Sequence, residues 1–155
     1  MASQNLYSMP GHLIRRAQQI AVSIFLDECA SLDMTPVQYA ALVTIRDHPG
    51  IDATRLSALV AFDRSTLANV LERLETKRLI LRSGNHNDRR VKVLRLTPEG
   101  EAVLAQAEPL VDRAQTRILA PLPPEDRQAF MSILARLVES NNEVSRAPLR
   151  LTSAS

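Results

Sequence analysis

Apolar residues recur at three- and four-residue spacing over two long stretches, one near each end of the chain, which is the pattern of amphipathic helices. The first stretch runs from Leu13 to Leu32, and the second runs from Pro98 to about Val144. The proline-rich segment 119–124 divides the second stretch into two helices. These stripes exceed what a small domain can cover, so we expect residues 10–33 and 98–144 to form a helical dimerisation region.

Between these stretches, residues 35–97 show the start and stop signals of shorter helices. Thr35 and Gln38 are placed to form a capping box at the start of one helix. Asp52 and Asp63 are placed to cap a two-turn helix and the helix after it, with a short connection between the two. This spacing predicts a helix-turn-helix.

After Leu79 the period changes from helical to alternating, and turn-forming residues at positions 84–88 separate two short strands. Thr97 is placed to cap the next helix, whose first turn tolerates Gly100. The expected fold is mainly α with a small β-hairpin wing: a winged helix-turn-helix lobe joined to the dimerisation helices. Residues 145–155 lack a helical period, and we expect a flexible tail there.

Length and composition are those of one folded domain, residues 1–155. Hydrophobic residues make up 45% of the chain, which excludes an intrinsically disordered protein, while 4 glycines and 3% aromatic residues favour helices over β-sandwiches. The amino-terminal segment does not resemble a secretory signal, and no apolar run approaches the roughly 20 residues that span a bilayer. We therefore expect a cytoplasmic location and no membrane partner. The single cysteine, Cys29, permits neither an internal disulfide nor a cysteine-based zinc site.

The positive charge of the chain is concentrated in one segment. Residues 64–95 hold nine basic and three acidic side chains, a net charge of +6, whereas the whole chain carries +2. This distribution is typical of a polyanion-binding surface. A solvated charged face is the alternative, but the charge coincides with the helix-turn-helix spacing and with a hairpin tip.

The helix that follows Asp63 carries a polar face. Thr66, Asn69 and Arg73 fall together on it, with Ser65 near its amino-terminal end. Short polar side chains of this kind offer donors and acceptors to base edges in a major groove, whereas a solvated face usually carries Glu and Lys. For Ser65, Thr66 and Asn69 taken singly, an ordinary surface or capping role remains an alternative.

The tip of the expected hairpin carries Arg89 and Arg90. Both would project beyond the lobe. Guanidinium groups in that position suit phosphates and a narrow minor groove. The basic segment therefore combines a helix face for reading bases with a hairpin for gripping the DNA backbone.

Three segments together resemble the MarR (multiple antibiotic resistance regulator) family of winged helix-turn-helix transcription factors, and the match covers nearly the whole chain. They are DRSTLANVLERLETKRLI, NDRRVKVLRLTPEG and LPPEDRQAFMSILARL. The resemblance implies a homodimer on a pseudo-palindromic operator in double-stranded DNA. It also implies, in most members, a repressor released by a small molecule or by oxidation.

The resemblance also implies residue roles. It places base reading and a phosphate contact on four residues of the recognition helix: Ser65, Thr66, Asn69 and Arg73. In the wing, Asp88 resembles an orienting carboxylate, and one of Arg89 or Arg90 would enter the minor groove. Arg78 departs from the family, which most often has Gly there, so an arginine would occupy a helix end that favours a left-handed residue.

Candidate effector residues lie outside the basic segment. His12 and Arg16 are one turn apart beside the apolar stripe of the first long helix, and this arrangement would suit a carboxylate-bearing effector. The effector we expect is a small aromatic carboxylate at the junction of lobe and dimerisation helices, with Tyr39 contributing. A surface or intersubunit salt bridge is the alternative for His12 and Arg16.

Other function classes have weaker support. A redox-responsive regulator would have to sense through Cys29, which has no second cysteine to resolve it. A winged-helix module that binds proteins instead of DNA would not need Asn69, Arg89 and Arg90. The chain lacks a nucleophile elbow, a P-loop, a dinucleotide fingerprint and histidines at metal-ligand spacing. We therefore expect no enzyme activity, no cofactor and no metal.

Overall fold

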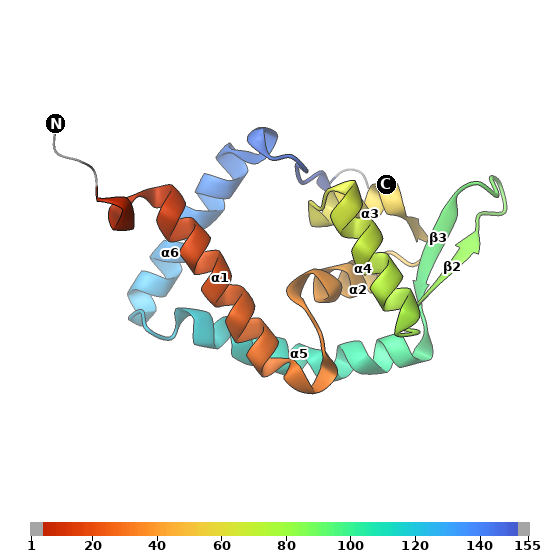
Figure 1. Cartoon of the computed structure of the whole chain (residues 1–155), viewed down its shortest axis with the longest axis horizontal. Helices are drawn as coiled ribbons and strands as arrows, with labels where there is room; N and C mark the ends of the chain where they lie inside the picture. The colour runs from red at the N-terminus through yellow and green to blue at the C-terminus, as the bar shows by residue number, and fades with distance from the viewer. Residues whose placement is uncertain (1–4, 152–155) are drawn as a thin grey trace.

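The structure is a computed structural model that describes residues 5–151, and it confirms a mainly helical fold with a small antiparallel sheet (Figure 1). None of the helices in this range is long and apolar enough to cross a membrane. In chain order the elements are η1 (Leu6–Ser8), α1 (Pro10–Glu28), η2 (Ala30–Leu32), α2 (Pro36–Asp47), β1 (Ile51–Asp52), α3 (Ala53–Val60), α4 (Arg64–Thr76), β2 (Ile80–Gly84), β3 (Lys92–Leu96), α5 (Pro98–Leu119), α6 (Pro124–Ser140) and η3 (Asn142–Val144).

The helices of the central lobe begin where their caps predict. The Thr35 hydroxyl accepts the Gln38 backbone N–H at 3.2 Å, and the Gln38 side chain accepts the Thr35 N–H at 3.4 Å, which completes the capping box. Asp52 and Asp63 each accept the backbone N–H three residues further on, at 2.9 and 2.8 Å. The connection between α3 and α4 turns at Ala61, whose φ of 56° is left-handed. The predicted helix-turn-helix is therefore confirmed.

The sheet has one strand more than the sequence predicts. The hairpin of β2 and β3 pairs Ile80 with Leu96 at its base and Gly84 with Lys92 near its tip. Strand β1 pairs with the other edge of β3, so the strand order is β1-β3-β2. A strand of two residues is too short to produce a detectable alternation, which explains why the sequence did not reveal it.

The core lies in the lobe and extends along α5. Helix α5 buries five residues, α1 buries only Phe25, and α6 buries none within the described chain. Most of the apolar stripe predicted on the first helix is therefore exposed in one chain. In Figure 1, α5 runs from the base of the wing to α6 and carries α1 against its far half, so it links the two parts of the molecule.

The junction between the wing and α5 requires a glycine. The Thr97 N–H donates to the Leu79 carbonyl at 3.0 Å, and the Thr97 hydroxyl accepts the Gly100 N–H at 2.9 Å. A Cβ added at Gly100 would lie 2.0 Å from the Leu79 carbonyl oxygen. The sequence indicated only that α5 tolerates Gly100, whereas the packing shows that the close approach depends on it.

The end of α4 adopts the left-handed conformation that the family comparison implied for Arg78, with φ of 60°. The Leu79 N–H donates to the Leu74 carbonyl at 2.9 Å, and the Arg78 N–H donates to the Glu75 backbone carbonyl at the same distance. These two bonds form a Schellman motif, which usually has glycine at the left-handed position. Arg78 therefore occupies a strained backbone conformation.

One predicted boundary is wrong. The first helix ends at Glu28 instead of Leu32, because the chain tightens into η2 and then turns at Asp33, whose φ is 48°. The tail expected to be flexible over residues 145–155 is held by hydrogen bonds over part of its length, to Asn142 and to α3. The side-chain amide that closes this segment gives no periodic signal in the sequence. Residues 152–155 lie outside the described residues.

Candidate nucleic-acid interface

Helix α4 buries one face and presents another to solvent. Ser65, Asn69 and Arg73 are exposed at four-residue intervals, and Thr66 beside them is half-buried. The opposite face packs into the core through Leu67, Val70, Leu71 and Leu74. The structure therefore brings together the four recognition-helix residues that the sequence selected, along the outer side of α4.

The first turn of α4 is held by Asp63. The carboxylate accepts the Thr66 backbone N–H at 2.8 Å and the Ser65 hydroxyl at 2.9 Å. These hydrogen bonds, led by that from Thr66, lower the pKa of Asp63. Because the Ser65 proton is already donated to Asp63, Ser65 presents oxygen lone pairs outward and is suited to accept from a base amino group.

The wing carries its arginines at the tip. Asp88 accepts the Arg90 backbone N–H at 3.0 Å and lies 3.3 Å from the Arg90 Nε, while the Arg90 side chain is 92% exposed. Asp88 therefore orients Arg90. Arg89 is also exposed and makes no ion pair with any residue between 5 and 151. The base of the wing is tied to α4 by the ion pair of Arg82 with Glu75, at 2.8 Å.

A polar link joins the end of α4 to the start of α2. The Lys77 ammonium donates to the Asp33 carbonyl and, at 3.1 Å, to the side-chain oxygen of Gln38. Gln38 is only 4% exposed, so this link is partly shielded from water. The recognition helix is thereby connected to the segment through which α1 enters the lobe. No pattern in the sequence indicated these roles of Lys77 and Arg82, because their partners are distant in the chain or lie in another element.

The three candidate effector residues do not come together in one chain. His12 contacts Arg15 at 3.4 Å and stacks edge-on with Tyr7, while Arg16 is exposed. Tyr39 packs against Phe25, with ring centroids 6.0 Å apart. Phe25 is thirteen residues beyond His12, about 20 Å along the helix. A site that includes all three residues would therefore need a second protomer.

Two surface depressions in the described chain each hold a pair of arginines, and neither is lined by the candidate effector residues. One, of about 360 Å³, lies between α3 and α4 and includes Arg64 and Arg82. The other, of about 370 Å³, lies where α1 meets α5 and includes Arg113 and Arg117. The arginines of the second depression are paired with acidic residues of α1, at 3.4 Å and 2.6 Å, so much of their charge is already balanced.

Cys29 is completely buried, and burial raises the pKa of its thiol, with Glu28 adding to the effect. A sensing cysteine has the opposite properties, a lowered pKa and access to solvent. The geometry therefore argues against the redox alternative. Cys29 belongs instead, as a small apolar side chain, to the same core cluster as Phe25 and Met34.

These features define a class of protein. Two helices joined through a tight left-handed turn, an exposed polar face on the second helix and a basic hairpin beside it are the parts of a winged helix-turn-helix DNA-binding protein.

Comparison with known proteins identifies the family. The MarR family model matches residues 34–92. Transcriptional regulator HosA of Escherichia coli O127:H6 is 34% identical over 108 residues, which cover 70% of this chain and 80% of HosA. The chain belongs to the MarR family and is a transcriptional regulator, not an enzyme.

Solved structures have the same fold. The transcriptional repressor CouR, bound to a 23-mer DNA duplex, matches with a TM-score of 0.79 and 30% identity over 89% of this chain and 98% of CouR. BpsR of Bordetella bronchiseptica, whose DNA binding is regulated by 6-hydroxynicotinic acid, matches with a TM-score of 0.81 and 28% identity over 88% of this chain and 97% of BpsR. Both likenesses extend over the lobe and the long helices.

Proposed function

We propose that this regulator is a homodimeric repressor that binds a pseudo-palindromic operator and is released by a small aromatic carboxylate. The observation that carries DNA binding is the exposed polar row of α4 beside an arginine-tipped wing. Ser65, Thr66 and Asn69 read base edges, and Arg73 contacts a phosphate. In the wing, one of the exposed arginines, Arg89 or Arg90, enters the minor groove, and Asp88 fixes the direction of Arg90.

The dimer is supported by apolar side chains that one chain leaves exposed. Helix α6 is apolar along one side yet buries none of its residues in the described chain. Large exposed hydrophobic side chains occur on both helices of the expected interface: Leu13, Ile14 and Ile20 on α1, and Phe130, Ile133, Leu137 and Val138 on α6. Burying this surface against a second copy would stabilise both protomers. It would also set the distance between the two recognition helices.

Release by an effector follows from that distance. Both lobes bind when their recognition helices match successive major grooves, roughly 34 Å apart. An effector that prefers another spacing by 1–3 kcal/mol changes DNA occupancy about 5- to 150-fold. The aromatic-acid class is supported by what regulates BpsR. In a dimer, Arg16 and His12 of one protomer would bind the carboxylate of the effector, and Tyr39 of the other protomer would contact its aromatic ring.

The first experiment is a gel shift with the promoter DNA beside the gene. Binding should fall about a thousandfold between 50 and 200 mM salt if about six phosphates are contacted. Arg89→Ala and Arg90→Ala should weaken binding on every sequence. Asn69→Ala should also change the preference among bases. Absence of binding at low salt would favour the protein-interaction module, and equal losses on all sequences for Asn69→Ala would remove its reading role.

The second experiment tests dimer and effector separately. Sedimentation of the free protein gives the oligomeric state. Ile133→Glu, at a side chain that is 63% exposed in one chain, should shift it toward the monomer. Benzoate-like acids and 6-hydroxynicotinic acid are then titrated into the DNA complex of the wild type and of Arg16→Ala. If an acid releases the wild type from DNA but not Arg16→Ala, the proposed effector site is supported. If no acid releases either protein from DNA, aromatic acids are excluded as the effector class.

A further inference from the structure

The chain that follows α6 returns to the DNA-binding lobe. We name residues 142–150 the C-terminal strap. In Figure 1 it leaves the end of α6 and crosses to α3. There the Arg150 backbone N–H donates to the Ala58 carbonyl at 2.9 Å. The next-turn donor for Ala58 would be the Phe62 N–H, which bonds to Ser57 instead, at 3.2 Å. The strap therefore satisfies a carbonyl that the end of α3 leaves without a helical partner.

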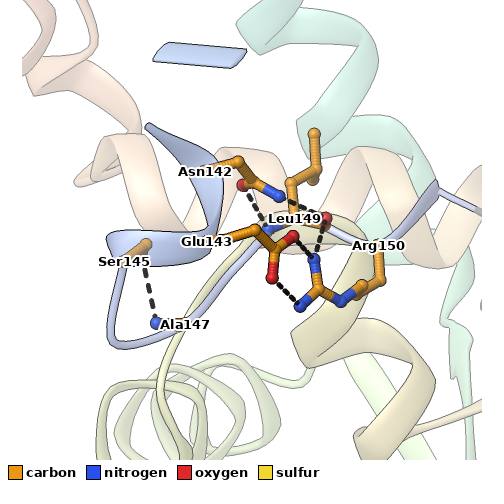
Figure 2. A network of polar contacts seen from close by, with 6 residues as sticks. All are labelled: Asn142, Glu143, Ser145, Ala147, Leu149 and Arg150. Atoms are coloured by element: carbon orange, nitrogen blue, oxygen red, sulfur yellow. Dashed lines mark hydrogen bonds and ion pairs between the residues drawn. The ribbon is translucent and has the colours of Figure 1, made fainter. Parts of the chain in front are cut away.

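The strap is closed by its own side chains, as Figure 2 shows. The Asn142 amide group donates to the Leu149 carbonyl at 3.1 Å and accepts the Leu149 N–H at 2.9 Å, so it acts like a paired backbone unit. The Arg150 guanidinium forms two hydrogen bonds with Glu143, at 2.5 and 2.9 Å, and these lower the pKa of the Glu143 carboxyl. The conformation of the loop between Asn142 and Arg150 is therefore held by hydrogen bonds within the strap, in addition to its bond to α3.

The loop carries one further arginine. Arg146 lies in the middle of the strap and is exposed. The strap is bonded to α3 at Ala58, five residues before Asp63 in the chain, and the positive charge of Arg146 adds to the lowering of the Asp63 pKa. Asp63 caps α4, and Ser65 and Thr66 follow it directly. The strap therefore brings a basic side chain from the end of the sequence to the amino-terminal end of the recognition helix.

We propose that the C-terminal strap fastens α3 to α6 and that Arg146 contacts a DNA phosphate beside the amino-terminal end of α4. Arg146 is the phosphate ligand because it makes no ion pair within residues 5–151, whereas Arg150 is engaged by Glu143. Arg150 positions the strap through its backbone N–H. This inference rests on the DNA binding proposed above, and it adds a contact that is distant in sequence from both the recognition helix and the wing.

The first test compares two charge deletions in the full-length protein. DNA binding is measured over a range of salt concentrations for the wild type, Arg146→Ala and Arg136→Ala. Arg136 is an exposed arginine of α6 and serves as the matched control. Loss of one phosphate contact reduces the slope of log affinity against log salt by about 0.9 per protomer. We expect that change for Arg146→Ala and an unchanged slope for Arg136→Ala.

The second test separates the backbone bond from the side chain. Arg150→Ala and Arg150→Pro both remove the ion pair with Glu143, but only proline also removes the N–H that donates to Ala58. We expect Arg150→Pro to lower DNA affinity several-fold below Arg150→Ala, with the dimer fraction and helix content of the two variants equal. Circular dichroism and sedimentation check that equality.

The outcomes distinguish this inference from the proposed function. If the wild type fails to bind DNA at low salt, the proposed function fails. If the wild type binds and Asn69→Ala alters its preference, but Arg146→Ala and Arg136→Ala give the same slope, only the strap inference is overturned. Tighter binding by Arg146→Ala or Arg150→Pro than by the wild type would also overturn it, because the strap would then oppose DNA.

Discussion

Replacing Gly100 with alanine tests the junction that joins the wing to α5. The added methyl would lie 2.0 Å from the Leu79 carbonyl oxygen, 3.0 Å from its carbon and 3.3 Å from its Cα. All three are backbone atoms, so no side-chain rotation relieves the clash. Either the start of β2 or the first turn of α5 must move. Movement there would disturb the hydrogen bond from the Thr97 N–H to the Leu79 carbonyl.

The size of the effect follows from three contributions. Overpacking of a well-packed site costs about 1–3 kcal/mol. Weakening the hydrogen bond between Thr97 and Leu79 costs about 1 kcal/mol more. The higher helix propensity of alanine returns up to about 1 kcal/mol. The net expectation for Gly100→Ala is a loss of about 2 kcal/mol in the free energy of unfolding, a lowering of the urea midpoint by about 1 M.

Gly11→Ala is the matched control. Gly11 also lies in the first turn of a helix that starts with proline, but an added Cβ meets no atom of the described chain within 4 Å. Its expected effect is neutral or stabilising by up to about 1 kcal/mol. Urea unfolding of both variants at one protein concentration provides the comparison. Equal midpoints for Gly100→Ala and Gly11→Ala would refute the reasoning from close packing.

Three further predictions concern single residues. Arg78→Gly should stabilise the fold by roughly 0.5–1 kcal/mol in urea unfolding, because glycine adopts the left-handed conformation without a Cβ penalty; Arg78→Ala should give no gain. Folding lowers the pKa of Asp63, so its cap stabilises α4 at pH values above the ordinary carboxyl pKa of about 3.8, and this stabilisation is lost as the pH falls through the folded pKa. The free energy of unfolding of Asp63→Asn should therefore change less between about pH 5 and pH 2 than that of the wild type. Cys29 should react with an aromatic disulfide reagent only as fast as the protein unfolds, and rapid reaction of the native protein would contradict the burial of its thiol.

Local signals in the sequence account for the parts of the fold that it predicted. The caps at Thr35, Asp52 and Asp63 each act within three residues, and the apolar period of α4 repeats over its whole length. Such interactions are encoded in adjacent positions and can be read without tertiary structure. For the same reason the polar row on α4 was found from residue spacing alone.

Contacts between distant segments could not be predicted from the sequence. Lys77 meets Asp33 across 44 residues, and Arg150 reaches Ala58 from the other end of the chain. Neither pair belongs to a period or a motif. The candidate effector residues were grouped by chemistry, but Tyr39 of α2 packs against Phe25, which lies a long way along α1 from His12. Distances along a rigid helix decide such groupings, and composition does not record them.

Helix α5 has a mechanical consequence because it belongs to both halves of the molecule. Its 22 residues make a rod about 33 Å long. If one end is held in the dimer, a tilt of about 5° moves the wing end by about 3 Å, which is close to the rise of one base pair. Each lobe would then be displaced by one step of the duplex. In the proposed dimer, a ligand would therefore need to produce only a small angular change near the fixed end to put the two lobes out of register with the DNA.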